Sequence, residues 1–268
     1  MNFESATAVE RLDDARFTGF IAEGWDISGN ANGGYLMAMA GRAMRQFSGC
    51  ADPVSLSAHF LAPGRVGPTD ISLSTVKAGR RFTTMRGSMN ANGKPLIELL
   101  GCFTNGLPEP GQIERIDAVA PSMPSPDACF AHAENPVAPN FFRKLDIRIH
   151  PEDAGWAFNK PSGEARVRGW FRWADQAPVD SLGLLLALDA FPPTIFNANL
   201  PVGWAPTVEL TAHIRARPAP GWLRAVFTTR FVSGGFLEED GEIWDESDRM
   251  VAQSRQLALV PLPPASSS

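Results

Sequence analysis

The spacing of hydrophobic positions along the chain changes from helical to strand-like, and this sequence of elements occurs twice. A run with helical spacing comes first, "GGYLMAMAGRAMRQF" at Gly33–Phe47 and "VDSLGLLLALDAF" at Val179–Phe191. Both runs are apolar on nearly every side, which predicts helices enclosed by other elements. Four strand-like runs follow each helix, separated by turn-forming residues. They cover Val54–Ala62, Thr69–Ala78, Phe82–Asn90 and Lys94–Phe103, and then Val208–Ala216, Trp222–Val232, Phe236–Asp245 and Arg249–Val260.

Two of these strand segments are similar in sequence. "LSAHFLAPGRVG" begins at Leu56 and "LTAHIRARPAPG" begins at Leu210, an offset of 154 residues. The same offset, without a gap, places "KPLIELLGCF" over "DRMVAQSRQL". A register kept over about fifty residues predicts an internal duplication. The expected organisation is an N-terminal unit at 1–104, a linker at 105–140 rich in Pro, Ser and Ala, a C-terminal unit at 141–262 and a tail at 263–268.

Each unit therefore reads as a helix followed by an antiparallel meander. Alternate positions from 54 to 60 are Val, Leu, Ala and Phe, and positions 208 to 214 repeat them with Ile in place of Phe. Because alternate residues of a strand share a face, these apolar faces should cover the helices. The predicted fold class is α+β, with one sheet curled around one helix, twice.

Composition narrows the possible partners. The net charge of −5 argues against a nucleic-acid or anionic-membrane surface. No apolar stretch is long enough to span a membrane, and the N-terminus does not have the pattern of a signal peptide. The three cysteines and four histidines are scattered without metal-ligand spacing, so we expect reduced thiols in a cytoplasmic protein and no metal site.

Several segments resemble the double-hotdog acyl-CoA thioesterases, the type II bacterial enzyme and its relatives. They are "WDISGNANGGYLMAMAGRA", "SLSAHFLAPG", "APTVELTAHIRARP" and "MVAQSRQLAL", and the resemblance covers most of the chain. It implies a double hotdog, in which two antiparallel sheets each wrap a central helix. It also implies hydrolysis of acyl-CoA thioesters without a cofactor. Exposed sheet faces in this fold usually pair, so a homo-oligomer, a dimer, is expected.

The resemblance also implies a catalytic trio of Asp, Thr and Gln. Asp189 lies at the matching place on the second helix, Thr207 at the start of the next strand, and Gln256 on the last strand. The chain departs from the family pattern twice. Pro192 and Pro193 should end the helix early, and one added residue in "HIRARP" leaves Thr211 as a rival for Thr207.

The chemistry of these residue types suits the hydrolysis of a thioester. The reaction needs a positioned water, a group that takes its proton, and donors for the developing oxyanion. Burial and the end of a helix would raise the pKa of Asp189 and make it a better base, while Thr and Gln can hold the water. Strict strand alternation, however, turns Thr207 away from the helix, unless the strand begins after Pro206 or carries a bulge.

The first half has no such trio. At the offset of 154, Cys102 repeats Gln256 and Pro53 repeats Thr207, which predicts one working site per chain. The first half can still contribute through "NANGGY". Asn32 can cap the helix, so the N–H groups of Gly33 and Gly34 would be free to bind a substrate carbonyl. Alternatively, the two glycines only permit close helix–sheet contact.

Two other functions remain open at this stage. A hotdog hydratase or dehydratase acting on acyl thioesters would need an Asp–His or His–Glu pair, and neither predicted helix contains a histidine. His59 and His213 occupy the same place in both repeats, which favours a structural role. A non-catalytic acyl-CoA-binding protein would keep the fold without a working trio.

Overall fold

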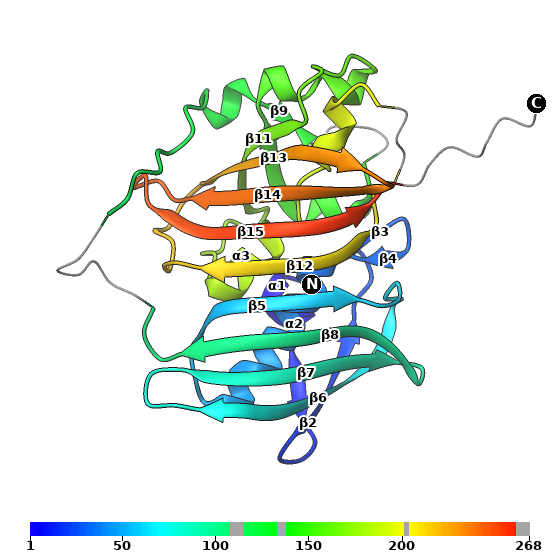
Figure 1. Cartoon of the computed structure of the whole chain (residues 1–268), viewed down its shortest axis with the longest axis vertical. Helices are drawn as coiled ribbons and strands as arrows, with labels where there is room; N and C mark the ends of the chain where they lie inside the picture. Colours follow the sequence, from blue (N-terminus) through cyan, green and yellow to red (C-terminus); the bar gives the residue numbers. More distant parts are fainter. Residues whose placement is uncertain (108–114, 133–137, 201–203, 261–268) are drawn as a thin grey trace, which may run out of the picture.

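The computed structural model describes residues 1–107, 115–132, 138–200 and 204–260. The predicted tail and parts of the predicted linker lie outside these ranges. The main element is one antiparallel sheet of 13 strands (Figure 1). Its first-half strands are β1 (Val9–Arg11), β2 (Arg16–Ile21), β5 (Asp52–Phe60), β6 (Gly67–Ala78), β7 (Thr83–Ala91) and β8 (Lys94–Thr104). Its second-half strands are β9 (Phe130–Ala131), β10 (Leu145–Ile149), β11 (Arg166–Trp173), β12 (Thr207–Ile214), β13 (Leu223–Ser233), β14 (Phe236–Trp244) and β15 (Met250–Leu259).

The strand order of this sheet is nearly symmetric. From one edge it runs β1-β2-β6-β7-β8-β5, and the other half continues β12-β15-β14-β13-β11-β10-β9. Ser57 on β5 lies opposite Thr211 on β12, and their hydroxyl oxygens are 2.7 Å apart. These two residues are related by the offset of 154, so the axis relating the halves passes between them.

The expectation of two separate sheets does not match this arrangement. β5 and β12 hydrogen-bond to each other over Glu209–His213, which joins the two halves into one continuous sheet. Each strand would otherwise leave a row of unpaired N–H and C=O groups at a sheet edge, and pairing satisfies both rows. A separate pair of short strands, β3 (Asp26–Ile27) and β4 (Asn30–Ala31), precedes the first long helix.

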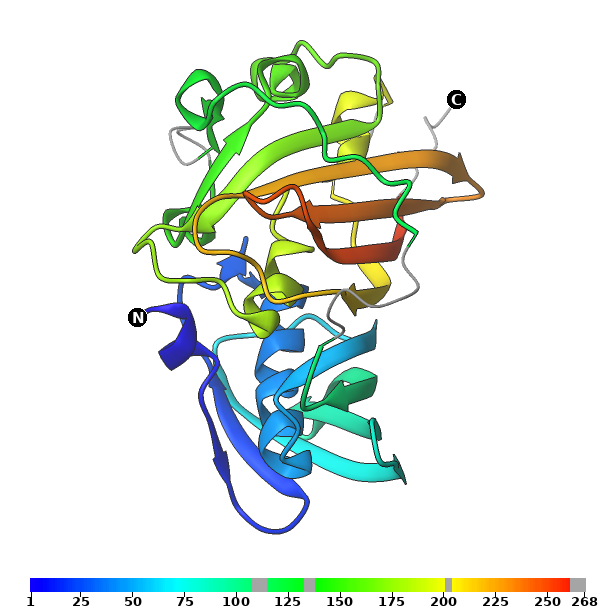
Figure 2. The ribbon, with the colours of Figure 1, turned by 90° about the vertical axis from the view of Figure 1, so that its left-hand side faces the viewer.

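The first long helix, α2 (Gly33–Ser48), agrees with its prediction. The Asn32 side chain caps it by accepting the N–H of Tyr35 at 2.9 Å, and Gly49 ends it in the left-handed conformation with φ of 68°. The helix contacts β1, β2, β5, β6, β7 and β8. Figure 2 shows it on one side of the sheet, with β1 and β2, in dark blue, curling past its other side. This enclosure explains why the helix is apolar on nearly every side.

The second helix, α3 (Ser181–Ala187), is shorter than predicted. Asp180 caps its start by accepting the N–H groups of Leu182 and Gly183. The helix ends before Asp189, whose N–H donates to the carbonyl of Leu186 at 2.9 Å in a closing turn. Pro192 and Pro193 cannot continue a helix and restrict the residue before them, so the last turns of the predicted helix do not form.

The two helices run antiparallel and pack tightly. A Cβ atom added at Gly34 would lie 2.7 Å from the Leu185 carbonyl oxygen and 2.9 Å from the Cα of Leu186. Glycine is therefore required here for helix–helix contact, rather than for the helix–sheet contact considered from the sequence. No helix within the described residues has both the length and the apolar character needed to cross a membrane.

The ungapped repeat is wrong in one strand. β7 and β14 keep the offset of 154, which relates Met85 to Glu239. Met85 lies opposite Gly101 on β8, whereas Glu239 lies opposite Gln256 on β15. The residue of β8 that corresponds to Gln256 is therefore Gly101, not Cys102. One extra residue in the hairpin between β14 and β15 causes the shift. A one-residue slip turns every side chain to the other face, and Cys102 consequently lies on the outer face of the sheet.

The remaining helices are short. They are α1 (Phe3–Ala6) and the 3-10 helices η1 (Pro126–Ala128), η3 (Asn140–Arg143), η4 (Pro151–Asp153), η5 (Gly155–Phe158) and η6 (Thr194–Asn197). η6 follows Asp189 and the two prolines. The Asn197 side chain holds it by donating to the carbonyls of Asp153 and Arg166 at 2.8 and 3.0 Å.

Candidate active site

Asp189 lies where the end of α3 meets the start of α2. The Asn32 amide donates to the Asp189 carboxylate oxygen Oδ2 at 2.9 Å and to its main-chain carbonyl at 2.8 Å. The Gly34 N–H donates to the same Oδ2 at 2.8 Å. The carboxylate therefore comes from the second half of the chain, and its hydrogen-bond donors come from the first.

Two opposing effects set the acidity of Asp189. Burial raises its pKa to about 6, while the N–H groups of Gly34 and Gly33 and the Asn32 amide act in the opposite direction. The dipole of α2 also favours a negative charge at its N-terminus. Asp189 is thus mostly ionised at neutral pH, yet basic enough to accept a proton.

The N-terminus of α2 already binds a carboxylate in this arrangement. The sequence predicted that the N–H groups of Gly33 and Gly34 bind a substrate carbonyl, whereas the Gly34 N–H binds Asp189. Gly33 lies under the ring of Phe60, and an added Cβ would be 2.8 Å from that ring and 3.0 Å from Asp189 Oδ2. Packing is therefore a sufficient reason for both glycines, and substrate binding by Asn32, Gly33 and Gly34 stays a prediction.

Thr207 and Gln256 lie together on the inner face of the sheet. Gln256 Nε2 donates to Thr207 Oγ1 at 2.7 Å. A β-bulge between Thr207 and Glu209 inserts one residue into β12, so Thr207 lies opposite the buried Ala258. The bulge turns Thr207 to the inner face of the sheet, whereas strict alternation would place it on the outer face. The first half has the matching bulge between Pro53 and Ser55.

Thr211, the rival of Thr207, lies on the other face. It alternates with the fully buried Leu210 and Ala212, and its hydroxyl bonds to Ser57 and to the carboxylate of Glu209. The structure therefore brings Thr207, and not Thr211, to Gln256.

A buried carboxyl group that the sequence did not single out lies beside this pair. Glu239 is opposite Gln256 on β14 and is only 9% exposed. Burial raises its pKa to about 7, and the nearby charge of Asp189 contributes to the rise. In "LEED" it looks like part of an exposed charged run. The available signal was the repeat, because Glu239 falls on the apolar position of Met85.

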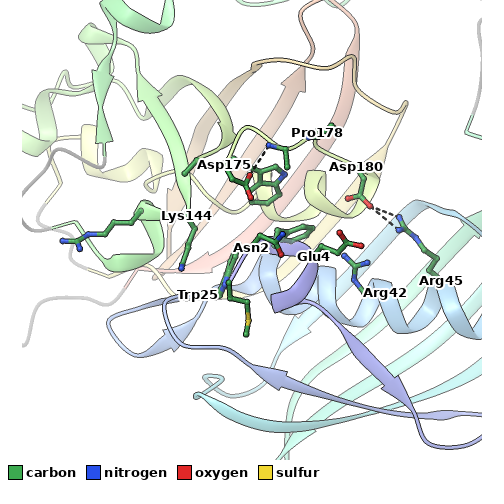
Figure 3. Close-up of a pocket in the computed structure, with 15 residues that line it drawn as sticks. Asn2, Glu4, Trp25, Arg42, Arg45, Lys144, Asp175, Pro178 and Asp180 are labelled. Atoms are coloured by element: carbon green, nitrogen blue, oxygen red, sulfur yellow. Dashed lines mark hydrogen bonds and ion pairs between the residues drawn. The ribbon is translucent and has the colours of Figure 1, made fainter.

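One cavity lies away from Asp189. It has a volume of about 570 Å³ and lies beside α1 and the start of α3, between aromatic and charged side chains (Figure 3). They include Trp25, Trp173, Arg42, and the ion pair between Arg45 and Asp180. This cavity is at the opposite end of α3 from Asp189. A second cavity, of about 450 Å³, contains Arg80 and Arg81.

One cluster has the residue types of a metal site. His150, Glu152 and Asp153 bring possible ligand atoms within 4.8 Å of one another. The Arg168 guanidinium already bonds this cluster, with Nε 2.7 Å from Asp153 Oδ2 and Nη2 2.7 Å from Glu152 Oε2. The positive charge that these carboxylates require is therefore supplied by arginine.

Comparison with known proteins gives the relatives of the chain. The models of the acyl-CoA thioesterase N-terminal domain and C-terminal domain match residues 21–104 and 117–260. An uncharacterized protein of Mycobacterium tuberculosis is 30% identical, covering 97% of this chain and 98% of that protein. A thioesterase-like protein of Talaromyces wortmannii is 23% identical, over 96% of this chain and 91% of its own length.

Solved structures agree with these matches. A thioesterase II candidate from Thermobifida fusca has a TM-score of 0.88 and 32% identity, covering 97% of both chains. A protein of unknown function with a hot dog fold, from Alicyclobacillus acidocaldarius, has a TM-score of 0.86 at 22% identity, covering 97% of this chain and 98% of that one. The second likeness establishes the hotdog fold.

Proposed function

Because the chain belongs to the acyl-CoA thioesterase family and is a thioester hydrolase, we propose that it cleaves acyl-CoA with Asp189 as the general base. The observation that carries this proposal is the Asp189 carboxylate, buried and held at the N-terminus of α2 with a pKa of about 6. A base of that pKa is largely unprotonated at neutral pH and still accepts a proton from water.

Thr207 and Gln256 hold the attacking water in this mechanism. The Thr207 hydroxyl accepts a hydrogen bond from Gln256, so the two side chains keep one relative position. Asp189 takes a proton as the water oxygen bonds to the thioester carbonyl carbon. The tetrahedral intermediate then collapses, the C–S bond breaks with its electron pair leaving on sulfur, and the thiolate takes up a proton. The products are a carboxylic acid and free CoA.

The oxyanion formed at the carbonyl needs donors, and the start of α2 is a source of them. Asn32, Gly33 and Gly34 are the residues we assign to substrate binding. Their amide and N–H groups already donate to the Asp189 carboxylate. Protonation of that carboxylate weakens these hydrogen bonds. The donors then become available as the oxyanion develops.

We also assign the chain to the double-hotdog arrangement, as an internal duplication. The near-symmetric strand order and the axis between Ser57 and Thr211 support this assignment. The boundaries at 104, 140 and 262 belong to the same proposal, as do the dimer and the cytoplasmic location. Within the predicted linker, β9 pairs with β10 of the second unit.

The test is the release of free thiol from a panel of acyl-CoAs of different length, with the absorbance of enoyl-CoA followed in parallel. Thiol release with no change in enoyl-CoA is the expected result. A change in enoyl-CoA without thiol release would instead identify a hydratase or dehydratase. Binding of acyl-CoA without either reaction would identify a non-catalytic acyl-CoA-binding protein.

A further inference from the structure

Glu239 is a buried carboxyl group that the proposed mechanism does not use. It projects from the inner face of β14 toward η6, where its Oε2 accepts the N–H of Thr194 at 2.8 Å. Burial of an ionisable group is costly unless hydrogen bonds compensate it. The first half has Met85 at this position, so the fold itself does not need a carboxyl group there.

The bond to Thr194 acts on the segment that carries Asp189. Four residues separate Asp189 from Thr194, and two of them, Pro192 and Pro193, restrict the backbone. Thr194 is further tied to β13, since its hydroxyl lies 2.7 Å from that of Thr229. The Asp189 segment is thus held at one end by α2 and at the other by β13 and β14.

Glu239 also borders the other half of the site. It lies directly opposite Gln256 in the β14–β15 ladder, on the same face. Side chains opposite each other on one face have Cβ atoms about 5 Å apart and influence each other's position. Gln256 in turn bonds Thr207. One side chain therefore touches the segment of the base and borders the pair that holds the water.

We propose that Glu239 is a positioning residue of the thioesterase site, which fixes the Asp189 segment, through Thr194, relative to Gln256 and Thr207. This inference rests on the proposed function. It adds a residue outside the Asp–Thr–Gln trio, and it gives the second half a polar contact that the first half cannot make.

The charge of Glu239 matters as well as its shape. Among the described residues, the charges that act on it and raise its pKa, beyond the effect of burial, are those of Asp189 and Asp240. Asp240 faces the outer side, where it bonds Arg255. With a pKa of about 7, Glu239 is neutral when Asp189 first ionises. Its own ionisation at higher pH places a second negative charge in the site, opposing the developing oxyanion.

Two variants test this role. Glu239→Gln keeps the size and an oxygen for Thr194 while removing the titration. It should retain kcat within about threefold near pH 6. It should also lack the fall in kcat that we expect of the wild type above about pH 7. Glu239→Met introduces the residue of the first half and removes the bond. It should lower kcat roughly 10–100-fold with little change in KM, the usual effect of a small misplacement.

The matched control is Glu238→Gln, on the same strand but facing outward and not among the charges that raise the pKa of Glu239, which should leave both kcat and the pH profile unchanged. Wild-type kcat in a folded Glu239→Met variant, or in Glu239→Ala if Glu239→Met fails to fold, would overturn the proposal. A different variant tests the proposed function itself. Hydrolysis of acyl-CoA by Asp189→Asn at the wild-type rate would contradict that function, whatever the result at Glu239.

Discussion

The two halves of the sheet share their strand order but differ at three matching inner positions. In the second half these three positions are polar or ionisable, and in the first half they are apolar or without a side chain. The pairs are Glu239 and Met85, Gln256 and Gly101, and Thr207 and Pro53. A sheet of nearly symmetric strand order therefore holds one candidate site, and the second half supplies its polar side chains.

Of the two central helices, the longer and more regular one belongs to the first half. α2 has 16 residues and a well-formed N-terminus, while α3 has only 7 and ends before Asp189. The short helix leaves Asp189 in a turn, where its carboxylate reaches the start of the long one. The second half thus supplies the carboxylate of the candidate site, and the first half supplies its hydrogen-bond donors.

The largest effect is expected at Asp189. Asp189→Asn keeps the size and the acceptor for the Gly34 N–H but cannot take a proton. Turnover should fall roughly 10²–10⁴-fold, the usual contribution of a general base, while acyl-CoA binding stays nearly intact. Thiol release and equilibrium binding measured on one purified variant check this.

The control for that experiment lies at the other end of α3. Asp180→Asn retains a side chain that caps helices equally well, so it should leave turnover unchanged. If Asp189→Asn itself keeps the wild-type turnover, Asp189 is not the general base. The difference between the two halves would then not explain the activity.

The sequence predicts much of this difference between the halves. The features that it does not predict have identifiable physical causes. α2 was predicted closely because Asn32 and the following glycines mark its start. Cys102 was paired with Gln256 because an ungapped repeat cannot show one extra residue in a hairpin. The side of the sheet that Thr207 faces depends on a bulge, a property of strand pairing rather than of local sequence.

Glu239 was missed for a different reason. Three acidic residues in a row suggest a solvated strand end, and alternation alone does not say which of them faces inward. Only the comparison with the apolar Met85 singles it out. A carboxyl group at a repeat position that is apolar in the other copy is therefore worth examining as part of a site.

The contact between the halves at Gly34 should be the next most sensitive feature. In Gly34→Ala the new methyl group meets the Leu185 carbonyl and the Asp189 Cβ, neither of which can move freely. Overpacking of this kind costs about 1–3 kcal/mol, more than alanine gains as a helix former. We expect a lower free energy of unfolding and a roughly tenfold or greater loss of kcat.

Gly41→Ala, on the same helix, separates this effect from a general response to alanine. Its methyl group would meet the Leu182 Cδ2 atom, the far end of a flexible side chain. Turnover should survive that change. Equal losses in the two variants would mean that the contact with Asp189 has no special role.

The pH dependence of stability provides a third test. The pKa of Asp189 is raised from 3.8 to about 6, so between these values the folded state binds more protons than the unfolded state. The free energy of unfolding should therefore fall as pH rises through this window, by roughly 2–3 kcal/mol for this group. Urea unfolding of the wild type at pH 4.5 and pH 7 should show the fall. In Asp189→Asn the fall in the free energy of unfolding should be smaller. An equal fall in the variant would mean that other titrating groups cause it.

The smallest effect is expected at Thr207, and it tests the bulge. Thr207→Val keeps the shape of the side chain and removes the hydroxyl that accepts the Gln256 amide. The loss of one hydrogen bond of about 1 kcal/mol predicts a roughly 3–10-fold lower kcat, with KM little changed. Thr211→Val removes a hydroxyl from the same strand, but on the outer face, and should leave kcat unaffected. If Thr211→Val lowers turnover and Thr207→Val does not, the bulge has been assigned to the wrong residue. The outer face of β12 would then need a part in the reaction.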